Sequence, residues 1–106
     1  MADKQVHEIL VIYFKDGIDY DEQLATMKQI GINSSKTKGF VSRKMFYTDV
    51  EKRWVDYFIW RDMAAADLSI ENAKVIPGAD ELFAKIDRKK AIWSRYYEVP
   101  EGRLGT

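Results

Sequence analysis

One carboxylate stands out because it interrupts a strongly apolar stretch of the sequence. Asp56 lies in the middle of residues 54–60, where every other residue is apolar or aromatic. Such residues favour a β-strand. An unpaired carboxylate buried in that strand would shift its pKa or require a partner. Asp56 is therefore the first candidate for catalysis, and Trp60, which strand alternation puts on the same face, is the second.

Three more residues are candidates for contacts with a ligand. Phe58 lies between Asp56 and Trp60 on that face and would form an apolar wall that excludes water. Asn72 would point from a helix toward the cleft, or else occupy the solvated side of that helix. Tyr96 is one of several tyrosines whose hydroxyls could orient a phenolic ligand, although tyrosine is also common where a sheet meets an interface.

Asp56 has a structural alternative, which is an ion pair across a hairpin. A three- or five-residue connection centred on Val50 would place Lys44 opposite Asp56, and a slip of one residue would place Arg43 there instead. The sequence leaves both roles open, and a carboxylate with a raised pKa could serve in both.

Apolar patterning predicts four strands, two helices and a shorter third helical piece. The strands are expected at residues 6–14, 40–47, 54–60 and 91–99. The helices are expected at about 20–36, from 62 to the break at Pro77-Gly78, and at 79–86. Asp19 and Asp62 precede the first two helices and are suited to cap them.

This order of elements predicts a ferredoxin-like α+β fold, a βαββαβ antiparallel sheet with the helices on one face. The first and third strands should be central, because they are the most apolar, and the second and fourth should be edges. We expect residues 1–100 to form a single domain and residues 101–106 a mobile tail.

The second face of this sheet predicts a homodimer. Both faces of the first and third strands are apolar, and helices can cover only one of them. The remaining patch, with His7, Ile9, Val11 and Tyr13 or their alternates, is larger than a monomer usually exposes. A two-fold dimer that packs one sheet face on the other would bury it.

Composition excludes several classes of function. Seventeen basic residues balance seventeen acidic ones, so no net field favours nucleic acid or an anionic membrane. Without cysteine and with His7 as the sole histidine, a disulfide framework, a metal site or a haem site is not expected. The first strand is too short to span a bilayer and its flanks do not resemble a secretory signal, so a cytoplasmic location is expected.

Over residues 6–99 the sequence resembles the dimeric α+β barrel proteins, a group that includes the antibiotic-biosynthesis monooxygenases. The most specific part is Asp56-Tyr57-Phe58-Ile59-Trp60, which leads into an alanine-rich helix. Cofactor-free monooxygenases of this group carry a similar Asn-Tyr-x-x-Trp, whose Asn and Trp face a substrate pocket between sheet and helices. The resemblance implies a pocket role for Asp56 and Trp60. The Asn is an Asp in this chain, and the helix-borne Tyr and Arg of those enzymes have no clear counterpart.

Two other branches of the group fit less well. Haem-degrading members place an axial histidine on the second helix, and residues 62–90 contain none. The stress-responsive and polyketide-cyclase branch has a pocket histidine early in its first strand. Counting back from Phe14, that position is Glu8, which makes Glu8 a further candidate for ligand binding, with His7 on the opposite face.

Two classes of function follow. One is a cofactor-independent monooxygenase acting on a small aromatic, phenol-like compound, with Asp56 as base or acceptor and Trp60 and Phe58 as walls. The other is a non-catalytic dimer that binds a small apolar ligand or serves as an accessory protein. A free Asp56 beside an open aromatic cleft would favour the enzyme, whereas a buried ion pair on a filled sheet would favour the binding protein.

Overall fold

Strands and helices alternate along the chain in the predicted order. The computed structural model describes residues 4–100, so the tail expected at residues 101–106 lies outside the described part. The elements are β1 (Val6–Ile12), α1 (Tyr20–Ser35), β2 (Phe40–Thr48), β3 (Arg53–Trp60), α2 (Met63–Val75), α3 (Ala79–Ala84) and β4 (Ile92–Tyr96).

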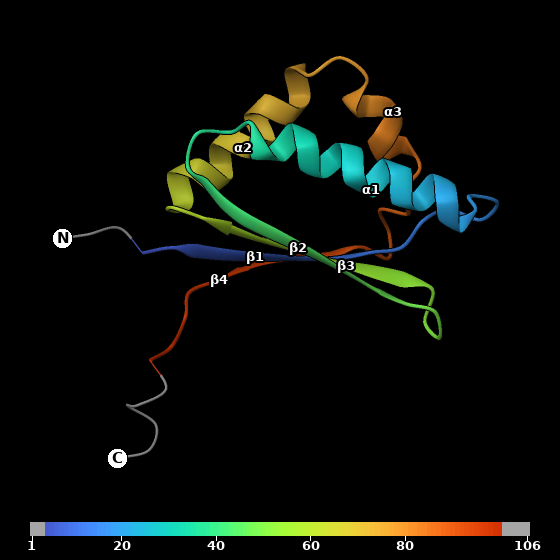
Figure 1. Cartoon of the computed structure of the whole chain (residues 1–106), viewed down its shortest axis with the longest axis horizontal. Coiled ribbons are helices and arrows are strands. Elements are labelled where there is room, and N and C mark those ends of the chain that lie inside the picture. The colour runs from blue at the N-terminus through green and yellow to red at the C-terminus, as the bar shows by residue number, and fades with distance from the viewer. Residues whose placement is uncertain (1–3, 101–106) are drawn as a thin grey trace.

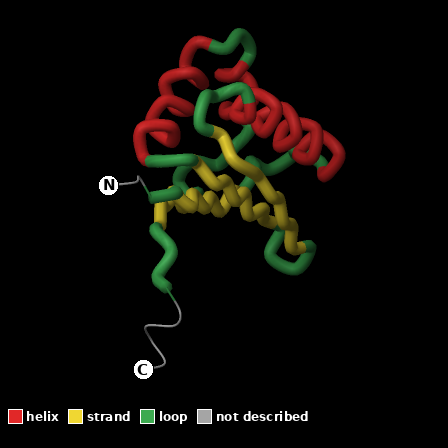
Figure 2. The backbone as a smooth tube through the Cα atoms, turned by 60° about the vertical axis from the view of Figure 1, so that its left-hand side comes forward, coloured by secondary structure: helices red, strands yellow, loops and turns green. Residues whose placement is uncertain are grey.

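The four strands form one antiparallel sheet in the order β2-β3-β1-β4. The prediction that the first and third strands are central is therefore confirmed. All three helices lie on one side of the sheet (Figure 1), and Figure 2 shows the helical layer stacked above the strands. The predicted ferredoxin-like α+β fold is confirmed.

Capping residues and a proline fix the ends of the helices. Asp19 caps α1 by accepting the backbone N–H of Glu22 at 2.9 Å, and Asp62 caps α2 by accepting that of Ala65 at 2.8 Å. Each cap satisfies a backbone N–H that the first turn of a helix leaves without a partner. At its other end α2 stops at Val75, just before the predicted break at Pro77.

Two strands are shorter than predicted. β4 ends at Tyr96, which pairs with His7 of β1, rather than at residue 99, and the chain then turns away from the sheet (Figure 1). β1 ends at Ile12, and Phe14 forms only an isolated bridge with Ile86, the residue that α3 was expected to include.

Two clusters of buried side chains join the helices to the sheet. One lies near the start of β1 and the other near its end. Their members are Val6, Phe58, Trp60, Ala65 and Ala66 in the first, and Ile12, Met27, Ile30, Trp54 and Ile86 in the second. Between them on the same face of the central strands lie two buried carboxylates, Glu8 and Asp56.

The opposite face of the sheet carries none of the helices of residues 4–100, and we call it the open face. Its residues are set by the strand register. They include His7, Ile9 and Val11 of β1, Phe46 of β2, Val55, Tyr57 and Ile59 of β3, and Ile92 and Tyr96 of β4. Phe46 is 53% exposed and Ile92 57% exposed. This face is therefore largely apolar and in contact with solvent.

No helix within residues 4–100 has both the length and the apolar character needed to cross a membrane.

Candidate functional site

A cavity of about 580 Å³ lies between the helical side of the sheet and the three helices. Its size falls within the roughly 300–1,000 Å³ that small-molecule sites occupy. The sheet contributes Glu8, Leu10, Ile12, Asp56, Phe58, Trp60 and Trp93 to its lining, and the helices and the segment after α3 contribute Ile30, Ser34, Ser69, Ile70, Ala73, Lys74, Asp80, Phe83, Ile86, Arg88 and Ala91.

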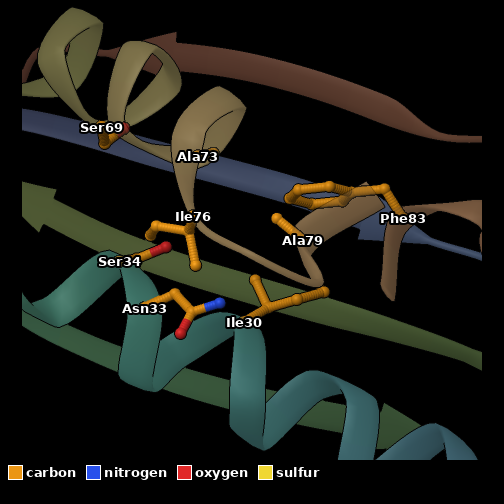
Figure 3. Close-up of a pocket in the computed structure, with 8 residues that line it drawn as sticks. All are labelled: Ile30, Asn33, Ser34, Ser69, Ala73, Ile76, Ala79 and Phe83. Carbon is orange, nitrogen blue, oxygen red and sulfur yellow. The ribbon is translucent and has the colours of Figure 1, made fainter. Parts of the chain in front are cut away.

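The helices approach one another at the far side of the cavity from the sheet. Figure 3 shows Ile30, Asn33 and Ser34 of α1 facing side chains of α2, α3 and the turn between them. The crevice that remains there has a volume of about 10 Å³, close to the minimum that holds one water molecule. We call this packed side the roof and the sheet side the floor.

Asp56 lies on the floor, is 1% exposed and is held by one arginine. Arg43 donates from Nε to Oδ1 at 2.7 Å and from Nη2 to Oδ2 at 2.8 Å. This is a bidentate, charge-assisted pair, the strongest geometry for a guanidinium and a carboxylate. Burial raises the pKa of Asp56, Arg43 opposes that shift, and the nearby charge of Glu8 adds to it. The pKa of Asp56 therefore lies above its ordinary value.

The register of the β2–β3 hairpin differs from the predicted one. Met45, and neither Lys44 nor Arg43, lies directly opposite Asp56, because the connection spans four residues, 49–52. Lys52 closes this turn with a φ of 55°. Arg43 reaches Asp56 as a diagonal neighbour on the same face, while Lys44 points to the open face. The predicted ion pair with Lys44 is therefore excluded. The ion pair with Arg43 does form, but between diagonal neighbours and not between directly opposite residues.

Helix α1 accommodates Arg43 at a glycine. Arg43 Nη2 also donates to the backbone oxygen of Met27, at 2.8 Å, so the guanidinium lies between sheet and helix. A Cβ atom on Gly31 would overlap Nη1 and Cζ of Arg43. Only glycine at this position leaves room for the guanidinium, which explains a residue that otherwise weakens a helix interior.

Glu8, the second carboxylate of the floor, is 5% exposed and accepts three hydrogen bonds. Trp60 Nε1 donates to Oε1 at 3.0 Å, while Trp93 Nε1 and Arg95 Nε donate to Oε2 at 2.6 and 2.9 Å. Arg95 Nη1 in turn donates to Asp67 of α2 at 2.6 Å. This network ties the two central strands and β4 to α2.

Each carboxylate of the floor thus has its own guanidinium, so the floor is close to neutral although it is strongly polar. The aromatic wall beside it is ordered, because Phe58 and Trp60 stack at 5.6 Å with 13° between their planes. Arg43 lies over the ring of Phe58, 5.3 Å from its centroid. The N–H of Trp60 is used by Glu8, which leaves its ring as the surface offered to the cavity.

The structure brings four of the six candidate residues to the cavity: Glu8, Asp56, Phe58 and Trp60. The other two lie elsewhere. Asn72 donates to Thr37 Oγ1 at 3.3 Å, and Tyr96 belongs to the open face opposite His7.

Trp93 and Arg95 are partners of Glu8 that were not among the residues predicted from the sequence. The available signal was their alternation along β4, since Arg95 lies directly opposite Glu8 and Trp93 opposite Leu10. That alignment requires the register of two strands that are distant in sequence, which the sequence pattern does not supply.

His7 lies on the open face, opposite in direction to Glu8, as its position in the strand implied. Its Nδ1 is 2.6 Å from the hydroxyl oxygen of Tyr57, and the two rings stack at 5.8 Å. Within residues 4–100 no group of three or more His, Asp or Glu side chains is placed to hold a metal ion.

Solved structures identify the fold. The chain is similar to SnoaB, a cofactor-independent oxygenase from Streptomyces nogalater, with a TM-score of 0.75 at 13% identity over 92% of this chain and 95% of that one. It is also similar to an antibiotic biosynthesis monooxygenase, with a TM-score of 0.69 at 16% identity over 90% and 99% of the two chains. The fold is that of the antibiotic biosynthesis monooxygenases. PA3566 from Pseudomonas aeruginosa shares it as well, with a TM-score of 0.73 at 10% identity over 94% and 99% of the chains.

At these low sequence identities, the similarity to the antibiotic biosynthesis monooxygenases is a similarity of fold alone. No protein-family profile matches the sequence, and no curated protein matches it.

Proposed function

We propose that the chain is a cofactor-independent monooxygenase that acts on a small phenolic compound bound in the cavity. The observation that carries this proposal is a buried carboxylate, Asp56, on the floor of a cavity walled by Phe58 and Trp60. The fold supports it, because SnoaB, described as a cofactor-independent oxygenase, has the same architecture.

The proposed reaction begins with a proton transfer to Asp56. Its raised pKa makes the carboxylate a better base than an exposed aspartate, while the guanidinium of Arg43 keeps it ionised before the substrate binds. The phenolate that results delocalises its charge into the ring, and an electron-rich ring carbon reacts with dioxygen. The peroxide that forms on that carbon takes the proton back from Asp56 and then loses water. One oxygen atom stays as a ring carbonyl, and the other leaves as water with the single hydrogen of that carbon and the returned proton, so that phenol and dioxygen give quinone and water.

The test is dioxygen uptake with a panel of phenols and anthrone-type compounds, with a chelator present and no flavin or metal added. Asp56→Asn keeps the shape and removes the base, and should lower turnover roughly 100-fold or more. Asp49→Asn, which changes an exposed carboxylate on the β2–β3 connection, is the matched control. Uptake that is equal in the wild type and Asp56→Asn would refute Asp56 as the base.

A second function is supported by the ion pair itself. Both oxygens of Asp56 are engaged by Arg43, and both oxygens of Glu8 by Trp60, Trp93 and Arg95. Such pairing suits a non-catalytic protein that binds a small ligand and uses the carboxylates to organise its floor. Tight binding of phenols without any dioxygen uptake would decide for this function.

We further propose that two copies pack through their open faces. The support is the apolar character of that face, with half-exposed Phe46, Ile92 and Tyr96 beside the central strands. A contiguous apolar surface of this kind is uncommon on a monomer and common at an obligate interface.

A further inference from the structure

A second hollow, with a volume of about 630 Å³, adjoins the cavity beside α3 and the segment that follows it. The two hollows border on each other, because four residues line both of them: Asp80, Phe83, Ile86 and Arg88. Five of the eight residues that line the second hollow are charged: Lys15, Asp80, Asp87, Arg88 and Lys89. We call this polar hollow the vestibule, since it continues the cavity.

Backbone hydrogen bonds fix the walls of the vestibule. The N–H of Lys15 donates to the carbonyl oxygen of Lys85 at 2.9 Å, and the N–H of Asp87 donates to that of Tyr13 at 2.8 Å. The segment after β1 is therefore tied to the segment after α3. Lys15 and Arg88, which are distant in the sequence, consequently line the same hollow.

The vestibule has one more cation than it has carboxylates. Its cations are Lys15, Arg88 and Lys89, and its carboxylates are Asp80 and Asp87. One oxygen of Asp87 accepts the backbone N–H of Lys89 at 3.1 Å. Among the ion pairs formed within residues 4–100, none involves a cation of the vestibule. Unlike the guanidinium groups beside the floor, that of Arg88 is therefore available to a ligand.

Arg88 is placed to bind a ligand that also occupies the cavity, because this exposed residue lines both hollows. A guanidinium binds a carboxylate through two parallel hydrogen bonds, a geometry that a neutral acceptor does not match. We infer that the aromatic ligand carries a carboxylate, that Arg88 binds this carboxylate in the vestibule, and that the ring lies in the cavity. This inference rests on the proposed function and adds a second anchor for its ligand.

The two arginines beside the floor are poorer anchors for a ligand carboxylate. Arg43 and Arg95 line neither hollow, and each already binds a carboxylate, that of Asp56 or Glu8. Arg95 Nη2 has no hydrogen-bond partner among residues 4–100, but it is buried and offers no surface to a ligand. A ligand carboxylate on the floor would also lie beside the charges of Asp56 and Glu8, which repel it. The carboxylate should therefore point away from the floor and orient the ring.

The experiment measures by calorimetry the affinities of α-naphthylacetic acid and α-naphthylacetamide, which differ in charge and hardly in shape. The pair is repeated with propanoic and butanoic side chains, because the length that reaches Arg88 is set by where the ring lies. At the best length the wild type should bind the acid roughly fivefold more tightly than the amide, the upper end of what an exposed ion pair contributes. In about 1 M salt, where charges are screened, this preference should shrink. α-Naphthol, which lacks the side chain, reports on the aromatic site alone.

Three variants assign the preference. Arg88→Gln should bind acid and amide alike and leave the affinity for α-naphthol unchanged, while Arg88→Lys, which keeps the charge but not the fork, should keep part of the preference. Lys28→Gln is the matched control, since Lys28 is exposed on α1, lines neither hollow and changes the net charge equally. Ala73→Phe, which fills the cavity, should abolish the binding of every probe.

Equal affinities of acid and amide at every length, with α-naphthol still bound, would overturn this inference and leave the proposed aromatic site standing. A preference that persists in Arg88→Gln, or an acid that still binds Ala73→Phe, would also overturn it, because the carboxylate would then be held without Arg88 or without the ring in the cavity. If no probe binds, α-naphthol included, the aromatic ligand of the proposed function fails and the inference fails with it. The comparison on the wild type and its salt dependence require no variant.

Discussion

At the scale of single residues, the floor of the cavity is an arrangement of paired charges. Asp56 interrupts an apolar strand, and its position in the structure is compatible with both a pocket role and a structural ion pair. It lines the cavity, and it is also half of a bidentate pair with Arg43. The two roles are compatible because a guanidinium that binds one edge of a carboxylate leaves acceptor positions on the other.

Gly31 should be more important to stability than its residue type suggests. Alanine in place of a helical glycine normally stabilises a helix by about 1 kcal/mol. In Gly31→Ala the new Cβ would displace Arg43 and leave Asp56 buried without its partner, which costs about 3 kcal/mol. We therefore expect the free energy of unfolding, measured in urea, to fall by about 2 kcal/mol, the difference between these two terms.

The control for this prediction is the same substitution in an Arg43→Ala background. The pair with Asp56 is already absent there, so Gly31→Ala should now stabilise the protein by about 1 kcal/mol. A Gly31→Ala variant that is more stable than the wild type would show that α1 does not need the gap for Arg43.

The sequence alone identifies Asp56 as a candidate site residue, but it does not predict which side chains from other elements lie around the two carboxylates of the floor. Asp56, Phe58 and Trp60 share one strand, so their common face follows from alternation alone. Two of the three partners of Glu8, Trp93 and Arg95, come from β4, which is far away in the sequence, and their positions depend on the β1–β4 register. Nothing local in the sequence indicates that Gly31 of α1 faces an arginine from β2.

At the scale of elements, local sequence signals predicted which helices and strands exist and in what order. They predicted the pairing register of the strands less well. Asp19 and Asp62 fix the starts of α1 and α2 through hydrogen bonds to nearby backbone N–H groups, and Pro77 ends α2 through local steric restriction. Those ends agree with the sequence to within a few positions. The β2–β3 register depends instead on the length and backbone geometry of the turn, including the positive φ of Lys52. No residue type in that turn required four residues rather than three or five.

The contribution of the Asp62 cap to the stability of α2 can be tested by substitution. Asp62→Ala should lower the midpoint of thermal unfolding at neutral pH by a few degrees, because the N–H of Ala65 loses its acceptor. Asp62→Asn, which retains an acceptor, should restore most of this loss. Equal melting of Asp62→Ala and the wild type would show that the cap does not stabilise α2.

The same cap gives a pH dependence of defined sign. The backbone N–H of Ala65, and then Arg61, hold the pKa of Asp62 below its ordinary value of 3.8. A carboxyl whose pKa is lower in the folded state stabilises the protein above the unfolded pKa, and loses that contribution as the pH falls through the folded value. The difference between the wild type and Asp62→Ala, followed by thermal melts, should be full at neutral pH and shrink below about pH 3.8.

At the scale of the whole molecule, the sheet has two different faces. The helical face is filled by two clusters of apolar side chains with the cavity and its paired charges between them. The open face has apolar residues on all four strands, and the histidine–tyrosine contact of His7 and Tyr57 lies on it. Because the net charge is zero, long-range repulsion does not oppose the approach of two such faces.

The dimer is the prediction that belongs to this scale. Val55 lies on the open face of the central strand β3, between Val11 and Phe46 of the neighbouring strands. A charge in Val55→Lys would be buried at a sheet-to-sheet interface, so sedimentation at micromolar concentration should show a dimer for the wild type and a monomer or unfolded chain for the variant.

Val75→Lys is the matched control, since Val75 is 78% exposed at the end of α2, away from the open face. It should sediment like the wild type. A wild type that sediments as a stable, folded monomer at that concentration would contradict the dimer and would require another cover for the open face.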